Sequence, residues 1–347
     1  LPAFAGHVPA AITTKFPNAK INKLGFWGDF RDQYRAHFLD PLDPLFPKIQ
    51  KAFMEEQTRQ FGTDHIYGTD PFNEIHPPSW EPDYLAKVGE TIYQSMAAVD
   101  PDAQWLQMTW VFYFDRKNWT NERIKAMVRS VPQDKMILLD YYCENQEVWK
   151  MTEKFFGQPY LWCYLGNFGG NTMLVGNLAE VEKRIENTFA NGGDKVWGLG
   201  STLEALDTNP VMYDYLFEKA WSTGPTDIGK WIADYGASRN GDTPAVRDAW
   251  KKLLEKVYVA PSQLGQGTLT NARPWFKGQG QWTTNPSIKY ANKDLLAILD
   301  QLLSTPLPGR DSYRYDVVNL CRQVIGNHFS KLREQFTTAC EAKDMTA

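Results

Sequence analysis

The sequence lacks the residue patterns that mark several common kinds of site. Its 347 residues include four cysteines, with no CxxC pair, and five histidines, none of them in an HExxH pattern. These spacings argue against a zinc site and against a dense disulfide framework. We therefore expect no metal or other cofactor. Cys163, inside the apolar run YLWCYL, is expected to be a buried free thiol.

Charge of one sign and long apolar runs are also scarce. The net charge is −4 and no run of Lys or Arg forms a stripe, so nucleic acid is not an expected partner. No apolar run reaches the roughly 18 residues that a spanning helix needs, so membrane insertion is not expected. The chain starts in LPAFAG, already strand-like and without a signal peptide, so we expect that the true N-terminus is left out.

Aromatic residues, in contrast, are abundant. The chain has 13 Trp, 16 Tyr and 19 Phe, or 14% of its residues. Most of these rings are expected to fill cores. The remainder would suit a sugar ligand, because the apolar faces of sugars stack on aromatic rings.

The first part of the chain alternates short apolar runs with helix-like patterns. Strands are predicted at 1–6, 65–69, 104–112, 135–142, 160–165 and 196–200, and helices at 43–62, 81–99, 121–131 and 177–192. Strands that are apolar throughout and alternate with helices indicate a parallel sheet covered on both faces. The expected fold class is therefore α/β.

A (β/α)8 barrel is a better interpretation of this α/β pattern than an open nucleotide-binding sheet. No GxGxxG follows a strand and no GxxxxGK[ST] occurs. The six predicted strands fall short of the eight that such a barrel needs. We therefore expect the barrel to be N-terminally truncated, with about two strands preceding Leu1.

The second part of the chain shows apolar residues at helical spacing and no convincing strand. We predict a barrel domain at 1–222 and an α-helical domain at 223–347 that continues beyond Ala347. The segment 259–285, rich in Gly, Gln and Thr, is either a substrate-facing loop or an ordinary long connection.

Two predicted strand ends carry a glutamate. Glu74 follows DHIYGTDPFN and precedes two prolines that forbid a helix, and Glu204 follows the glycine-containing strand VWGLG. Chemistry in barrels is located at the carboxyl ends of strands. Glycoside hydrolysis needs two carboxyl groups, one of which donates a proton and so needs a partly apolar pocket. Phe72, Trp110 and Trp162 could supply that pocket.

Other polar and aromatic residues at predicted strand ends would line the same mouth. His7, Trp110 and Asn167 fit an uncharged polyhydroxylated ligand, although each also has an ordinary structural interpretation. Asp70 and Asp140 are interpreted as structural hydrogen-bond acceptors. Glu144 remains open as a third candidate glutamate.

Three segments resemble one known family. LPAFAGHVP, FGTDHIYGTDPFNE followed by two prolines, and QPYLWCYLGNFGGN are similar to the α-N-acetylglucosaminidase family, which includes the lysosomal enzyme that trims heparan sulfate. The match covers about the first 220 residues closely and continues more loosely into NPSIKYANKDLL. The resemblance implies a small N-terminal domain, a (β/α)8 barrel and an α-helical domain.

The resemblance also implies an activity and the residues that perform it. The family removes terminal, non-reducing, α-linked N-acetylglucosamine with retention, by way of a covalent glycosyl-enzyme. The glutamate of the FNE motif is Glu74, which would be the general acid/base, and the aligned nucleophile is Glu204. Leu203 stands where the family pattern has proline. Asn73, Trp110 and Asn167 would be pocket residues.

Several alternatives stay open. The chain could be a barrel glycosidase of another specificity or a non-catalytic carbohydrate-binding protein. The resemblance implies a lysosomal or secreted protein, and the glycosylation sequon at Asn118 is weak support for secretion. A carbohydrate with terminal α-linked N-acetylglucosamine is the expected partner, and the oligomeric state, including a homo-oligomer, is open.

Overall fold

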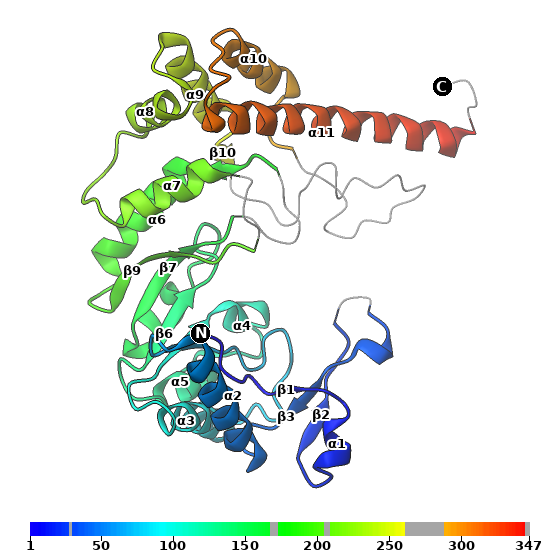
Figure 1. Cartoon of the computed structure of the whole chain (residues 1–347), viewed down its shortest axis with the longest axis vertical. Coiled ribbons are helices and arrows are strands. Elements are labelled where there is room, and N and C mark those ends of the chain that lie inside the picture. The colour runs from blue at the N-terminus through cyan, green and yellow to red at the C-terminus, as the bar shows by residue number, and fades with distance from the viewer. Residues whose placement is uncertain (28–29, 167–172, 205–208, 261–287, 344–347) are drawn as a thin grey trace. The chain divides into compact units, whose positions relative to one another are not determined.

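The computed structural model describes residues 1–27, 30–166, 173–204, 209–260 and 288–343 (Figure 1). The chain divides into two compact units. The first comprises Leu1–Tyr142, Gln146–Cys163 and Thr188–Gly198, and the second Cys143–Asn145, Tyr164–Asn187 and Leu199–Ala347. The predicted domain boundary at 222/223 lies inside the second unit and stays a prediction.

A five-stranded sheet forms the framework of the barrel-like part. Its strand order is β4-β5-β6-β7-β9, with β4 at Ile66–Gly68, β5 at Gln104–Met108, β6 at Met136–Asp140, β7 at Tyr160–Tyr164 and β9 at Val196–Ser201. β4, β5, β6 and β7 pair in parallel, with Trp105 opposite Met136 and Leu139 opposite Leu161. The predicted strands at 65–69, 104–112, 135–142, 160–165 and 196–200 are all present, although several are shorter than expected.

The predicted strand at 1–6 is reduced to its first residues. Pro2 forms a parallel bridge to Gly68 at the edge of β4. The Ala3 N–H donates to the Gly68 carbonyl at 2.8 Å, and the Gly68 N–H donates to the Leu1 carbonyl at 2.7 Å. The chain then leaves the sheet, because the next strand, β1 at His7–Val8, belongs to a separate small sheet.

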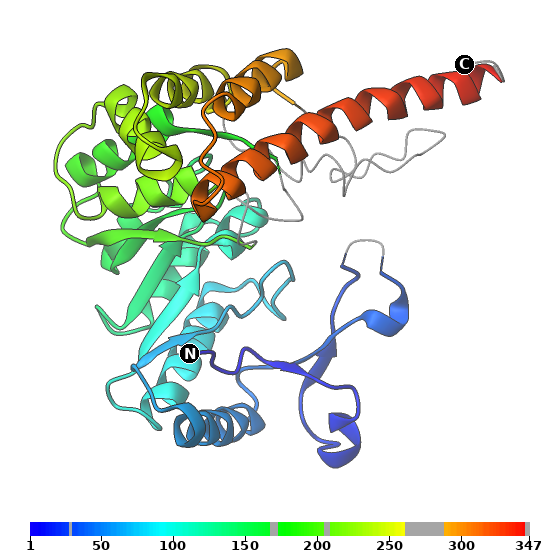
Figure 2. The same cartoon turned by 45° about the horizontal axis from the view of Figure 1, so that its top comes forward.

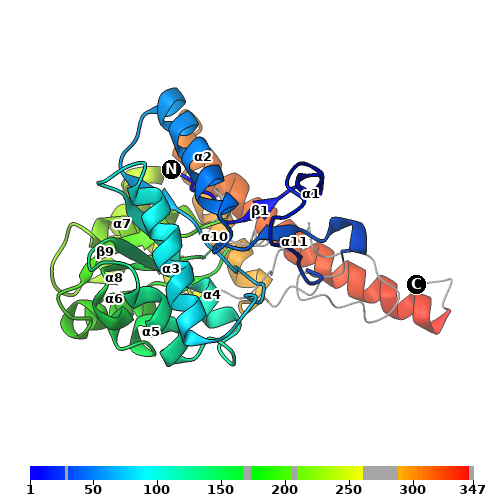
Figure 3. The ribbon, with the colours of Figure 1, turned by 90° about the horizontal axis from the view of Figure 1, so that it is seen from below.

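Helices follow the strands as the sequence predicts. They are α2 (Leu45–Phe61), α3 (Pro82–Ala97), α5 (Asn121–Arg129) and α6 (Leu178–Asn191). α3 begins with proline at its first position, and the Thr120 side chain caps α5 by accepting from the Arg123 N–H. α3 packs against both α2 and α5 (Figure 3). The buried faces of α2, α3 and α5 pack with strands of the sheet in one apolar core.

Two features of the first unit differ from the sequence prediction. The strand expected at 104–112 ends at Met108, and Trp110–Phe114 forms the short helix α4 instead. The Thr109 carbonyl accepts from the N–H groups of Phe112 and Tyr113, at 3.0 and 3.3 Å, and so starts the helix. The continuous aromatic run carried no period that could separate strand from helix.

The second difference is a small antiparallel sheet that was not predicted. Its order is β1-β3-β2, with β2 at Ile21–Lys23 and β3 at His37–Leu39. The connections carry α1 (Ile12–Lys15) and the 3-10 helix η1 (Asp32–Tyr34). Strands of two or three residues are too short for a periodic signal, which explains why the sequence did not indicate them.

The second unit is largely helical, as expected. It contains α7 (Pro210–Lys219), α8 (Ile228–Asn240), α9 (Pro244–Lys256), α10 (Asn292–Leu303) and α11 (Asp311–Ala342). Neighbouring helices in the chain pack on one another from α8 to α11, and α11 continues well past α10 (Figure 2). Arg239 makes a bidentate ion pair with Asp316, at 2.7 and 2.8 Å, that joins α8 to α11. The prediction that this part of the chain has no strand is wrong, because it contains β10 (Val259–Ala260), which pairs with β8 (Gly176–Asn177).

Candidate active site

Glu74 lies in a tight turn beyond the carboxyl end of β4. Two residues of this turn, Phe72 and Glu74, have left-handed backbone conformations, with φ of 65° and 54°. Non-glycine residues adopt this region only when their surroundings hold them there, and such residues cluster at functional sites. Here the Phe72 ring supplies the anchor, because it is buried and packs against Phe38 with ring centroids 5.4 Å apart. The anchor leaves the half-buried Glu74 at the tip of the turn.

Two tryptophans hold the Glu74 carboxyl group from different parts of the chain. The Trp110 indole donates to Oε1 at 2.8 Å, and the Trp27 indole donates to Oε2. Trp110 is the first residue of α4, and Trp27 lies in the connection between β2 and η1. A carboxylate offers about four acceptor positions on its two oxygens. The two indoles therefore fix the orientation of the carboxyl group and leave acceptor positions on both oxygens for a substrate.

Aromatic rings also line the site next to Trp110. The Trp110 ring lies 5.5 Å from Tyr113 and 6.0 Å from Tyr141, measured between centroids. Such an environment is partly apolar and provides ring faces near a carboxyl group. It fits the requirement for a proton donor that acts on a sugar.

Asp70, four residues before Glu74, has a different role. Its Oδ1 accepts from the Met108 N–H and from the Gln107 side-chain amide, both at 2.7 Å. Burial raises the pKa of Asp70 to about 7, and the hydrogen bond from Met108 opposes that rise. These bonds tie the end of β4 to the end of β5, which agrees with the interpretation of Asp70 as a structural acceptor.

The carboxylates of Asp140 and Glu144 also accept hydrogen bonds from other residues of the protein. Asp140 accepts from the backbone N–H groups of Val148 and Trp149 at 3.1 and 3.0 Å. Glu144 is buried and accepts from the N–H groups of Leu165 and Gly166 at 3.1 and 2.7 Å. A buried carboxylate that satisfies two backbone donors is a structural element. These contacts favour a structural role for Glu144 over that of a nucleophile.

Glu204 is exposed and lies three residues beyond Ser201, the last residue of β9. The segment before it is fixed, since the Thr202 N–H donates to the Tyr164 carbonyl at 3.1 Å and the Leu203 N–H donates to the Ser201 hydroxyl at 3.4 Å. Glu204 belongs to the second unit, whereas Glu74, Trp27 and Trp110 belong to the first. Its role as nucleophile stays a prediction.

The other predicted contact residues differ in their surroundings. Asn73 is exposed beside Glu74. His7 packs edge-on against Phe38, the ring that also contacts Phe72. Although His7 as a whole is exposed, desolvation lowers the pKa of its imidazole below the usual value and favours the neutral form. Asn167 lies outside the described residues, as do Trp275 and Trp282 of the long segment.

Trp162 does not fit the predicted role in the pocket. It stands in β7 with 0% of its side chain exposed, and its indole donates to Glu147 at 3.4 Å. A ring without exposed surface packs in the core and has no face for a sugar.

Trp27 is the residue that the sequence prediction missed. It is 47 positions from Glu74 in the chain, in a segment that showed no clear helix or strand period. The available signal was compositional, because LGFWGDF places three large aromatics in an otherwise polar stretch. Such a stretch is a candidate binding surface even when its secondary structure cannot be predicted.

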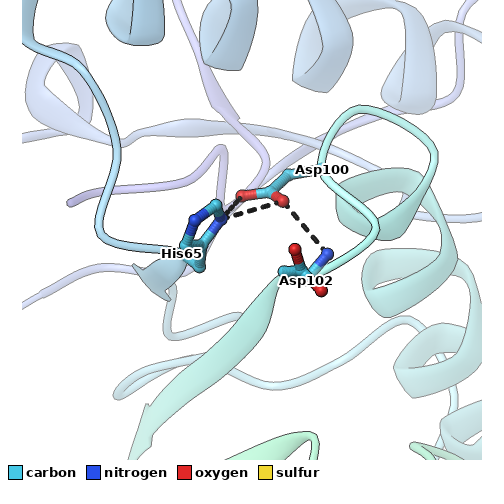
Figure 4. A group of neighbouring side chains, drawn as sticks. All are labelled: His65, Asp100 and Asp102. Atoms are coloured by element: carbon cyan, nitrogen blue, oxygen red, sulfur yellow. Dashed lines mark hydrogen bonds and ion pairs between the residues drawn. The ribbon is translucent and has the colours of Figure 1, made fainter.

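A second group of ionisable side chains, His65, Asp100 and Asp102, lies at the start of β4 and β5 (Figure 4). Each offers a ligand atom within 4.8 Å of the others. The structure gives Asp100 ordinary partners, since it accepts from His65 Nδ1 at 2.8 Å, the Tyr67 hydroxyl at 2.7 Å and the Asp102 N–H at 3.1 Å. Burial alone would raise the pKa of Asp100, but the bonds from Tyr67 and His65 outweigh burial and lower it. We interpret the group as a structural network.

The chain matches the models of two domains of one protein family. The model of the α-N-acetylglucosaminidase TIM-barrel domain matches residues 1–223, and that of the α-N-acetylglucosaminidase C-terminal domain matches 231–347. Human α-N-acetylglucosaminidase is 37% identical over 352 residues, which cover 100% of this chain and 47% of the human protein. These matches confirm the predicted fold class, a (β/α) barrel followed by a helical domain.

Solved structures of proteins from Clostridium perfringens are also similar to this chain. A family 89 glycoside hydrolase in complex with PUGNAc matches with a TM-score of 0.81 and 24% identity. A variant of the family 89 enzyme with two glutamates changed to glutamine, in complex with its substrate GlcNAc-α-1,4-galactose, matches with a TM-score of 0.82 and 25% identity. Each comparison covers 98% of this chain and 38% of the other. The chain thus spans less than half the length of these relatives. Among the described residues, no helix combines the length and apolar character needed to cross a membrane.

Proposed function

Because the chain belongs to the α-N-acetylglucosaminidase family, we propose that the protein is a retaining glycoside hydrolase that removes terminal, non-reducing, α-linked N-acetylglucosamine. The observation that carries this proposal is the Glu74 carboxyl group, held by the indoles of Trp27 and Trp110 beyond the end of β4. The substrate complex of the bacterial relative with two altered glutamates supports a mechanism that uses two such residues.

In the proposed mechanism Glu204 attacks the anomeric carbon and Glu74 protonates the oxygen that leaves. Water then hydrolyses the glycosyl-enzyme, and Glu74 takes the proton from that water. The indole hydrogen bonds keep the Glu74 carboxyl group in one orientation through both steps. Asn73, Trp110, Asn167 and His7 are proposed as substrate contacts. We also propose heparan sulfate as a natural substrate and the lysosome or the extracellular space as the location, both carried over from the family resemblance.

The stereochemistry of the first product tests the mechanism. The full-length protein is mixed with an aryl α-N-acetylglucosaminide, and the anomer formed first is recorded by proton NMR before it equilibrates. The proposal predicts the α anomer. Initial release of the β anomer would contradict retention. Faster turnover of aryl glycosides of other sugars than of the α-N-acetylglucosaminide would show another specificity. Binding without turnover would instead favour the non-catalytic carbohydrate-binding alternative.

A further inference from the structure

The connection between β2 and β3 displays a row of exposed rings, Trp27, Phe30 and Tyr34, which we call the aromatic ladder. Trp27 and Phe30 are stacked, with centroids 5.7 Å apart and planes inclined by 20°. Phe30 and Tyr34 meet edge to face at 6.0 Å. The three residues are 60%, 54% and 64% exposed. Adjacent large rings with this much exposure mark a binding surface rather than a core.

The base of the aromatic ladder is fixed. β2 and β3 pair through Ile21–Leu39 and Lys23–His37, and the Leu24 N–H donates to the Ala36 carbonyl at 2.9 Å. Arg35 closes the connection, because its Nε donates to the Leu24 carbonyl at 2.6 Å. A connection whose base is already paired needs less ordering when a ligand binds, which favours affinity.

The aromatic ladder begins at the proposed proton donor. The Trp27 indole donates to the Glu74 carboxyl group, so the first ring of the ladder lies directly beside that group. A general acid protonates the oxygen that leaves with the rest of the glycan. The sugars attached to that oxygen must therefore lie next to the Glu74 carboxyl group, on the side from which Glu74 delivers its proton.

From this continuity we infer that the aromatic ladder binds the leaving-group part of the glycan, with its sugars stacking on Phe30 and Tyr34. This inference rests on the proposed function of Glu74. A carbohydrate is the occupant that the position favours, since a protein partner or a second copy on the ladder would cover Trp27 beside the catalytic carboxyl group. The Arg35 guanidinium donates to the Leu24 carbonyl and the Asp32 carboxylate and lies 4.9 Å from the centre of the Phe26 ring, and so it supports the ladder from below.

Two substrates separate this role from a general effect on the site. One is an oligosaccharide with terminal α-linked N-acetylglucosamine followed by two further sugars, and the other is α-N-acetylglucosaminyl fluoride, which has no leaving-group sugar. The variants are Tyr34→Ala and Phe30→Ala in the full-length protein. The matched control is Phe61→Ala, which removes another exposed ring, at the end of α2. Values of kcat and KM are measured for each variant with both substrates.

The inference predicts that Tyr34→Ala lowers kcat/KM for the oligosaccharide about fivefold, mainly through KM, because one stacked ring contributes on the order of 1 kcal/mol. The loss with the fluoride should be much smaller, Tyr34→Phe should restore the oligosaccharide activity, and Phe61→Ala should show no substrate preference. Equal losses on both substrates, or no loss on either, would overturn the inference. So would a concentration-dependent dimer that Tyr34→Ala disrupts. Failure of the parent protein to cleave the fluoride at all would overturn the proposed function and the inference with it.

Discussion

Glu74 follows β4 and Glu144 follows β6, two strands of the same sheet, yet the surroundings of the two carboxyl groups differ in burial and in hydrogen-bond donors. Glu74 is half-buried and is held by two indole N–H groups from distant segments. Glu144 is buried and is held by two consecutive backbone N–H groups at the end of β7. The indole donors orient the Glu74 carboxyl group, which stays partly exposed. The backbone donors instead bind the Glu144 carboxyl group inside a turn. From this comparison we infer that burial and donor type distinguish a carboxyl group that is accessible to a substrate from one that closes a turn.

The largest expected effect follows from Glu74→Gln. The amide keeps the size of the side chain but cannot donate or accept the catalytic proton, so kcat on a natural disaccharide should fall about 10³-fold. The loss should be smaller on an aryl glycoside with a good leaving group, which needs less protonation. Glu81→Gln, at the exposed start of α3, is the matched control and should keep full activity. Full activity of Glu74→Gln on the disaccharide would contradict the assignment.

Asp70 extends the comparison to a half-buried carboxyl group that accepts from a side-chain amide and a backbone N–H, both of them uncharged donors. Its pKa of about 7 lies above the value of about 3.9 expected in the unfolded chain. The native state therefore binds the proton more tightly, and the free energy of unfolding should fall as the pH rises from about 4 to about 7. Asp70→Asn keeps an oxygen acceptor without a charge. It should be more stable than the parent at pH 8, by at most about 4 kcal/mol, and similar near pH 4.

Denaturant unfolding at pH 4 and pH 8 measures this difference. The exposed Asp83→Asn in α3 controls for the change in net charge and should not alter the dependence on pH. An equal shift of the Asp70→Asn stability at both pH values would show that the ionisation of Asp70 does not limit stability.

Glu144→Ala should act on stability rather than on chemistry. It leaves the N–H groups of Leu165 and Gly166 without these acceptors in a buried turn, which should cost about 3 kcal/mol. Glu144→Gln keeps one oxygen and should lose roughly half as much. Thermal unfolding of both variants checks the order. A Glu144→Gln variant that is fully stable but inactive would instead return Glu144 to the list of catalytic candidates.

Trp110→Phe is expected to have a smaller effect on catalysis than Glu74→Gln. It removes one hydrogen bond to the Glu74 carboxyl group and keeps most of the ring, so kcat/KM should fall about tenfold, since a hydrogen bond to a charged group contributes about 1.5 kcal/mol. Trp221→Phe, at a highly exposed position in the second unit, should leave kcat/KM unchanged. No loss in Trp110→Phe would mean that the indole bond does not position Glu74.

Much of this fold could be predicted because its elements are long or apolar enough to show a period. The strands β4, β5, β6, β7 and β9 and the helices α2, α3, α5 and α6 were found in this way. The β1-β3-β2 sheet could not be predicted, because its strands have only two or three residues. Trp27 was missed for the same reason, since only this small sheet and its connection bring it to Glu74. Trp162 was misplaced because periodicity does not reveal which face of a buried strand meets solvent.

The most direct test of the account is azide rescue of Glu74→Ala and Glu204→Ala, with the configuration of the glycosyl azide determined by NMR. In a retaining enzyme, azide replaces water when the acid/base is absent and replaces the nucleophile when that residue is absent. The account predicts the α-azide from Glu74→Ala and the β-azide from Glu204→Ala, both from an aryl α-glycoside with a good leaving group. A β-azide from Glu74→Ala, or no rescue of that variant, would contradict the assignment of Glu74 as the acid/base.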